Sequence, residues 1–220
     1  MKLIEKIFAN PRGFKISAFI GTICFITNAI LLIIGDGFVE NVYAIFISLI
    51  LGAFMLLIVF LTNKYYDNAV KGLIGTIFGV IFSYDLRIFA LHVKDFTALE
   101  LSLGIIKLVV DILFFAIYLI ARSSKNGSLK IITLCQSAFA LLVIVIILNN
   151  VPYFVSDFKD PNRIWFAQDF VETIAFISTY FSIMCATTIV NKYKTIRTNA
   201  SEKGEWTEEM RGKTKNNLFK

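Results

Sequence analysis

Hydrophobic residues gather in six long runs along the chain, separated by short polar segments. The runs cover residues 14–34, 42–62, 70–91, 99–121, 131–149 and 166–190. A helix of about 20 residues crosses the roughly 30 Å hydrocarbon core of a bilayer, and most of the runs have about that length. Their apolar residues cover all sides of a helix, unlike the two-residue alternation of a membrane β-barrel. The pattern predicts an all-α integral membrane protein with six transmembrane helices.

Composition supports this interpretation. Of the 220 residues, 57% are hydrophobic and only 17% are charged, compared with about 25% charged residues in ordinary soluble domains. The formal net charge is +6, but the basic residues lie in the short segments between the apolar runs and form no single patch. We therefore expect the lipid bilayer as a partner, and no nucleic acid.

The basic residues also predict the topology. Seventeen Lys and Arg residues lie in or beside the segments that precede the first run and follow the second, fourth and sixth, whereas four belong to the other connections. Cytoplasmic segments of membrane proteins carry an excess of Lys and Arg. The sequence therefore predicts that both the N and C termini are cytoplasmic and that the protein lies in the cell (cytoplasmic) membrane as a multi-pass protein.

Two segments are expected outside the transmembrane domain of residues 13–190. Residues 1–12 place apolar side chains on one helical face and lysines on another, which is typical of an interfacial amphipathic helix on the inner leaflet. Residues 191–220 form a basic cytoplasmic tail with eight basic and four acidic residues. We expect this tail to be partly disordered or associated with lipid, or else to bind a partner.

Charged residues inside the spans are the main functional signal, because such residues are costly in a bilayer and often mark functional sites. The third, fourth and sixth spans contain Asp85, Arg87, Lys107, Asp111, Asp169 and Glu172. With the predicted topology, Asp85, Lys107, Asp169 and Glu172 are expected to lie in the outer half of the membrane. Counted as ionised, the six residues carry a net charge of −2, and acidic residues in the outer loops add to it. The expected cluster would therefore favour cations, or cationic portions of a solute.

Helical spacing predicts how these charges face one another. Glu100, Gly104, Lys107 and Asp111 follow i, i+4, i+7 and i+11, so they share one face of a helix. Gly75, Gly79, Phe82 and Asp85 are expected to form a similar stripe on the third span, where the Gly75–Gly79 pair would allow another helix to approach closely. Asp169, Glu172 and Thr179 form a third stripe. Three such stripes facing one another would enclose a pocket open to the outside.

The same residues allow three interpretations. Lys107 could pair with Asp111, Asp85 or Asp169 and so only specify how the helices pack. The stripes could instead line a pathway for a solute or ion, or they could contact the helices of a partner membrane subunit.

The motifs of intramembrane and nucleotide-dependent enzymes are missing from the sequence. It contains no GxSxG, HExxH or P-loop pattern. Tyr84-Asp85 matches half of the intramembrane aspartyl protease pattern, but the partner GxGD is absent. Asp169 and Glu172 alone are too few oxygen ligands to indicate a divalent metal site. We expect no catalytic residues, no metal and no cofactor.

The leading hypothesis is a small multi-pass membrane transport protein with an outward-facing, net acidic site for a small cationic or zwitterionic solute or ion. Asp85, Lys107 and Asp111 would form the site, with Arg87, Asp169 and Glu172 at its mouth. The alternative is an accessory or assembly subunit of a larger membrane complex, whose polar stripes would contact a partner membrane subunit. A membrane-embedded enzyme is the third reading.

Overall fold

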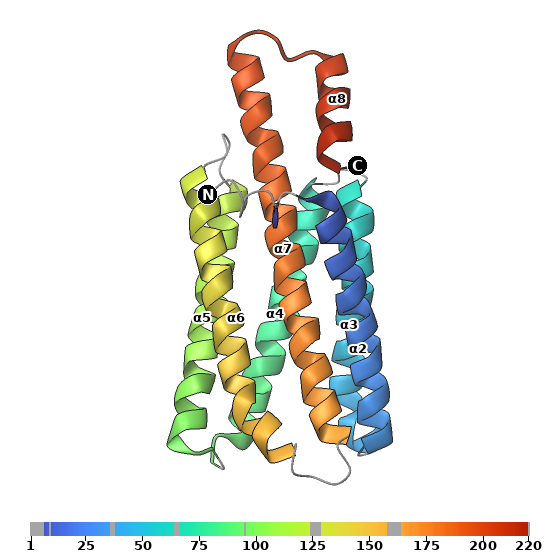
Figure 1. Ribbon diagram of the computed structural model, residues 1–220, viewed down its shortest axis with the longest axis vertical. Coiled ribbons are helices and arrows are strands. Elements are labelled where there is room, and N and C mark those ends of the chain that lie inside the picture. Colours follow the sequence, from blue (N-terminus) through green and yellow to red (C-terminus); the bar gives the residue numbers. More distant parts are fainter. Residues whose placement is uncertain are drawn as a thin grey trace.

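The protein is a bundle of long helices (Figure 1). The computed structural model describes residues 7–8, 10–35, 38–63, 67–94, 96–123, 129–157 and 164–219, and no strand occurs in these ranges. The helices are α2 (Pro11–Gly35), α3 (Phe38–Asn63), α4 (Asp67–His92), α5 (Ala98–Ser123), α6 (Leu129–Asp157), α7 (Ile164–Glu202) and α8 (Glu208–Phe219). Each of the six predicted spans corresponds to one helix from α2 to α7, with boundaries a few residues wider at most ends.

Successive helices run in opposite directions along the bundle (Figure 1). The start of α2 and the C-terminal part of α7 consequently lie at the same end. α5 and α6 form one side of the bundle, α2 and α3 form the other, and α4 and α7 lie between them. We call the end at which α4 finishes and α5 begins the α4–α5 end.

Local sequence signals account for the helix starts. The Asn10 side chain accepts a hydrogen bond of 3.0 Å from the Arg12 amide, and Pro11 occupies the first helical position of α2, where its missing N–H costs nothing. At the start of α5, Thr97 and Glu100 form a reciprocal capping box: the Thr97 amide donates to the Glu100 carboxylate at 2.8 Å, and the Glu100 amide donates to the Thr97 hydroxyl at 3.3 Å.

α7 is the central helix of the core, and small residues let α2 pack closely on it. The Ser17 and Ser182 hydroxyls are hydrogen-bonded at 2.7 Å across the two helices. A Cβ atom added at Gly21 would lie 3.4 Å from the Cβ of Ser178 and 3.3 Å from the end of Met55. Small residues at such contacts allow close helix approach in membranes, where packing and hydrogen bonds replace the hydrophobic driving force.

The outer faces of the helices are apolar. α2, α3 and α5 expose rows of large aliphatic side chains, such as Ile23, Leu49 and Leu113, which a bilayer would cover. Among the residues that the structure describes, five helices are long and apolar enough to cross a membrane: α2, α7 and the segments Asn41–Thr62, Gly72–His92 and Ala98–Ile120. In the described part of α6, the apolar stretch is shorter, Gln136–Pro152. The helices therefore indicate a membrane protein with several spans.

The C-terminal region differs from the expectation of partial disorder. α7 continues beyond the predicted end of the last span at residue 190, to Glu202. Its 39 residues make a helix of about 58 Å, which is longer than the roughly 30 Å hydrocarbon core. α8 then folds back beside the extension (Figure 1), and the Tyr193 and Trp206 rings meet edge to face with centroids 6.0 Å apart.

Most of the predicted interfacial helix, residues 1–12, lies outside the described residues. Within the described part, Arg12 already belongs to α2. Phe8 is buried in the core, where its ring lies 5.6 Å from that of Phe139 and 5.2 Å from that of Phe181. This side chain therefore packs between α6 and α7.

Candidate functional site

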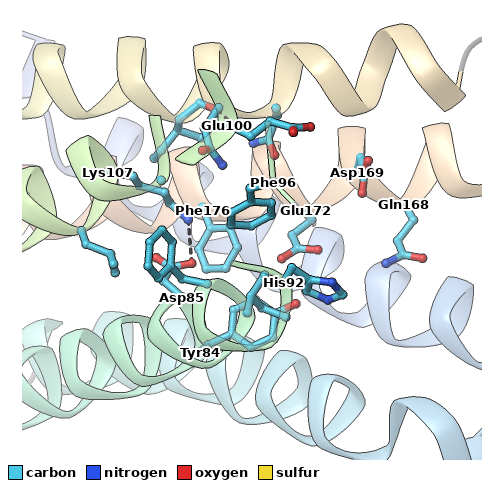
Figure 2. Close-up of a pocket in the computed structure, with 17 residues that line it drawn as sticks. Tyr84, Asp85, His92, Phe96, Glu100, Lys107, Gln168, Asp169, Glu172 and Phe176 are labelled. Atoms are coloured by element: carbon cyan, nitrogen blue, oxygen red, sulfur yellow. Dashed lines mark hydrogen bonds and ion pairs between the residues drawn. The ribbon is translucent and has the colours of Figure 1, made fainter. Parts of the chain in front are cut away.

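A polar pocket of about 430 Å³ lies between α4, α5, α6 and α7, toward the α4–α5 end of the bundle (Figure 2). Four carboxylates, one ammonium group, one imidazole and three amides contribute to its wall. These polar residues are Asp85, Glu100, Asp169, Glu172, Lys107, His92, Asn149, Asn150 and Gln168. Aromatic side chains, among them Tyr84, Phe89, Phe96 and Phe176, form most of the remaining wall. The pocket therefore combines an apolar frame with converging polar groups, as small-molecule sites do.

An ion pair forms one wall of the pocket. The Lys107 ammonium group of α5 lies 2.6 Å from the Asp85 carboxylate of α4, and Figure 2 shows this contact as a dashed line. Their side chains are only 15% and 7% exposed. The Lys107 ammonium also lies 5.4 Å from the centroid of the Phe176 ring, close enough for a cation–π contact. Of the three pairings considered for Lys107, the structure has the one with Asp85.

Asp111 lies one helical turn beyond Lys107 and does not line the pocket. Its side chain is 2% exposed, and its Oδ1 atom accepts a hydrogen bond of 2.7 Å from the Tyr180 hydroxyl of α7. Tyr180 is completely buried, and its ring packs against those of Phe78 and Phe114. Asp111 is thus held at the inner end of the charged stripe, between α5 and α7.

α7 forms the opposite wall. Glu172, Asp169 and Gln168 all line the pocket (Figure 2). The Tyr84 hydroxyl of α4 and the Glu172 carboxylate interact with each other. Glu172 therefore lies deeper in the helix contact than a mouth position would imply, whereas Asp169 is one turn closer to the α4–α5 end.

Glu100 has a structural role as well as a place in the wall. Its carboxylate accepts hydrogen bonds from both the amide and the hydroxyl of Thr97, at 2.8 Å and 2.7 Å. These bonds close the capping box at the start of α5. The predicted stripe of Glu100, Gly104, Lys107 and Asp111 does face the interior. Its outermost residue, Glu100, is hydrogen-bonded to Thr97 at the start of α5.

Arg87 is placed apart from the other predicted site residues. It is exposed and does not line the pocket. Its guanidinium carbon lies 3.9 Å from the centroid of the Tyr43 ring on α3, and that ring stacks on Tyr84. Since Arg87 follows Asp85 by two positions, a helix points the two side chains in widely different directions.

The glycine stripe expected on α4 faces another way. Asp85 shares the buried face of α4 with Phe78 and Ile81, whereas Gly79 is exposed. A Cβ atom added at Gly75 or Gly79 would have no neighbouring atom within 4 Å. The close helix approach predicted at these glycines is therefore not made within the described part of the chain.

Sequence reasoning missed several residues of the site. Tyr180 gave no signal, because a tyrosine in an apolar span is an ordinary core residue. Asn149 and Asn150 did carry one, since two adjacent amides near the end of an apolar run need polar surroundings. Gln168 gave a similar signal beside Asp169. All three amides belong to the segments that complete the pocket on α6 and α7.

The described residues contain no group of three or more His, Cys, Asp or Glu side chains placed to hold a metal ion. The chain matches no protein-family model, and comparisons with curated proteins and with solved structures also find no match. Fold and site together define an all-helical membrane protein with a polar pocket between four helices.

Proposed function

We propose that the protein is a small transport protein of the cell membrane that binds a small cationic or zwitterionic solute or ion in the pocket between α4 and α7. The observation that carries this proposal is the pocket itself: about 430 Å³, with carboxylates from three different helices on its wall. Its volume suits a small solute. The wall holds four carboxylates and one ammonium group, so its net charge, with all five groups counted as ionised, is negative and favours a positive group.

The wall groups divide into two sets. Asp85 is engaged by Lys107, and Glu100 by Thr97. Glu172 and Asp169 of α7 also line the pocket, and in this proposal they face the solute. Aromatic side chains such as Phe96 and Phe176 would contact its apolar portion and, through their ring faces, a quaternary or primary ammonium group. Lys107 would bind the carboxylate of a zwitterion.

The proposed orientation places the pocket on the outer side. In this arrangement α6 is the fifth of six spans and both termini are cytoplasmic, as the excess of basic residues on one side of the membrane indicates. The start of α2 and the extension of α7 lie at the end of the bundle opposite to the pocket (Figure 1). This common placement supports the proposed topology. Labelling of single cysteines in the α4–α5 connection and in α8 of intact cells tests it: only the former should react with an impermeant reagent.

Thermal unfolding of the purified full chain in detergent tests solute binding. The panel would contain sodium, potassium, ammonium, choline, betaine, neutral amino acids, basic amino acids and polyamines. We expect at least one of them to raise the midpoint of wild-type unfolding in a concentration-dependent way, because a ligand that binds only the folded state stabilises it by mass action.

Two variants make this measurement specific. Glu172→Gln should raise at least tenfold the ligand concentration that gives the same stabilisation. Arg87→Gln should leave this concentration unchanged, because Arg87 contacts Tyr43 and not the pocket. Both variants must first show cooperative unfolding without ligand. If no compound stabilises the wild type more than Glu172→Gln, the pocket is not a solute site.

An accessory subunit of a membrane complex is the second candidate, and the open glycine face of α4 favours it. Gly72, Gly75 and Gly79 present small residues with no atom within 4 Å of an added Cβ, a surface on which a partner helix could pack closely. Co-purification in mild detergent discriminates the two functions. A stoichiometric partner that is lost with Gly79→Leu, but kept with Gly212→Leu on α8, would support the accessory function.

A further inference from the structure

Asp85 and Asp111 are two buried acidic side chains that share one cation, Lys107. Both side chains are more than nine-tenths buried, with exposures of 7% and 2%. Asp85 lies 2.6 Å from the Lys107 ammonium group, Asp111 is one helical turn beyond Lys107 on α5, and the two carboxyl groups interact with each other. Lys107 is the cation that interacts with both. If both carboxylates were ionised, the trio would carry a net negative charge inside the membrane, where an uncompensated acid is costly.

In each of the two carboxyl groups, one oxygen is hydrogen-bonded within the described part of the chain and the other is not. Asp85 receives the Lys107 ammonium group on Oδ1, and Asp111 receives the Tyr180 hydroxyl on Oδ1. In both residues the Oδ2 atom is buried and has no hydrogen-bonding partner among the described residues. A buried carboxylate oxygen without a donor is strongly unfavourable.

A single bound proton would remove both the net negative charge and the unfavourable burial of two oxygens without a donor. We propose that Asp85 and Asp111 bind a single exchangeable proton between their Oδ2 atoms, and that this pair is the proton site of the transporter. A proton on one Oδ2 makes it a donor to the other, and the trio of two carboxyl groups and one ammonium group becomes neutral. Two neighbouring carboxyl groups that cannot both ionise share a proton in the same way in other proteins.

Other ionisable groups from the packed helices surround the pair. α4 contributes Tyr84, α5 contributes Lys107, and α7 contributes Glu172 and Tyr180. α3 contributes Tyr43, which stacks on Tyr84. The residues that α6 adds to the pocket wall are Ile146, Asn149 and Asn150, which do not ionise.

The pair is connected to the pocket because Asp85 lines it while Asp111 lies behind it. A cation in the pocket would repel the proton and favour its release, and the bound proton would in turn weaken cation binding by the same factor. This deepens the proposed function, on which the coupling to a solute rests, by naming the proton as the exchanged ion. Binding of the proton itself requires no solute.

Infrared spectroscopy of the full chain tests the proposal, in a detergent that has no carbonyl group and at pH 7. A protonated carboxyl group gives a C=O band separate from the carboxylate bands. We expect this band in the wild type, and we expect it to shift when H₂O is replaced by D₂O under native conditions. Asp111→Asn and Asp85→Asn should each reduce the band by one carboxyl group, because the remaining carboxylate then pairs with Lys107.

Asp169→Asn is the matched control, since it removes a pocket carboxylate outside the pair, and it should keep the band. The use of two variants on different helices protects the test from a folding defect in either. A band that is equal in the wild type and both pair variants, or one that does not exchange in D₂O, would overturn the proposal. The solute panel has a separate outcome: an exchangeable proton without any stabilising solute would leave the proton site intact and reject the transport function.

Discussion

The Lys107 ammonium group lies 2.6 Å from the Asp85 carboxylate, which links α5 to α4 at the depth of the pocket. Farther from the α4–α5 end, the Phe78 ring of α4 packs against the Phe114 and Phe115 rings of α5, with centroids 5.5 Å and 4.8 Å apart. The ion pair is therefore the polar end of an otherwise aromatic contact between the two helices. The two partners differ in their other neighbours, because a second carboxyl group, Asp111, also interacts with Lys107.

Lys107→Met should consequently be more destabilising than Asp85→Asn. Without Lys107, two neighbouring buried carboxyl groups lose their cation, and breaking a buried pair in this way costs about 3–5 kcal/mol. Without Asp85, Lys107 can turn to Asp111, so we expect less than about half of that loss. Thermal unfolding midpoints in detergent measure the order. Equal midpoints for the two variants would show that Asp111 does not compensate.

Tyr180→Phe should destabilise the protein by about 1.5–3 kcal/mol, the value of a hydrogen bond to a charged group. The variant keeps the ring contacts with Phe78 and Phe114 but leaves Asp111 Oδ1 without the donor that now lies 2.7 Å away. Chemical or thermal unfolding of the variant measures the loss. Tyr193→Phe is the control, because that ring meets Trp206 in the α7 extension. Equal effects of the two substitutions would contradict a specific role for the hydroxyl.

Gly21 and Gly79 offer a matched pair of substitutions. Gly21→Leu should lower stability by about 1–3 kcal/mol through overpacking, because an added Cβ already meets Met55 and Ser178 at 3.3 Å and 3.4 Å. Gly79→Leu should have little effect on the isolated chain, since the space at Gly79 is open. Unfolding midpoints of the two purified variants test this. A large loss at Gly79 would mean that α4 packs differently from the arrangement in Figure 1.

The sequence predicted the helices well because the physical signals are local. Most of the runs have about the length needed to span a bilayer, and caps such as Asn10 and the Thr97–Glu100 box mark where helices begin. The inward stripe of α5 was also predictable, since positions 100, 104, 107 and 111 must share a face in any helix. No knowledge of the neighbouring helices was needed for either result.

The rotation of α4 could not be predicted in the same way. Its two polar features, the glycines and Asp85, lie on different faces, and only the positions of α5 and α7 decide which face is buried. The sequence placed Arg87 in the same site as Asp85, although the structure turns it toward Tyr43. The contact between Asp111 and Tyr180 joins residues 69 positions apart, so spacing within one helix carries no trace of it.

Gly104 adjusts the shape of the pocket through Phe89. A Cβ at this position would lie 3.0 Å and 3.1 Å from two atoms of the Phe89 ring, and both residues line the pocket. Gly104→Ala should therefore push the ring aside and change ligand-dependent stabilisation, while the midpoint without ligand changes by less than about 1.5 kcal/mol. The comparison uses the same solute panel with and without the substitution. An unchanged ligand response would show that Phe89 moves without narrowing the pocket.

Trp206→Ala should release α8 and leave the bundle intact. The Trp206 ring meets Tyr193 edge to face, and such an aromatic pair is worth about 0.5–1.5 kcal/mol beyond its buried area. Because the α7 extension and α8 project from the bundle (Figure 1), losing this contact should raise amide hydrogen exchange in Glu208–Phe219 without altering exchange in the buried part of α7, around Tyr180. Glu209→Gln is the control: it removes only the exposed contact with Lys213, which contributes little. Faster exchange throughout α7 would instead show that the hairpin and the bundle unfold as one cooperative unit.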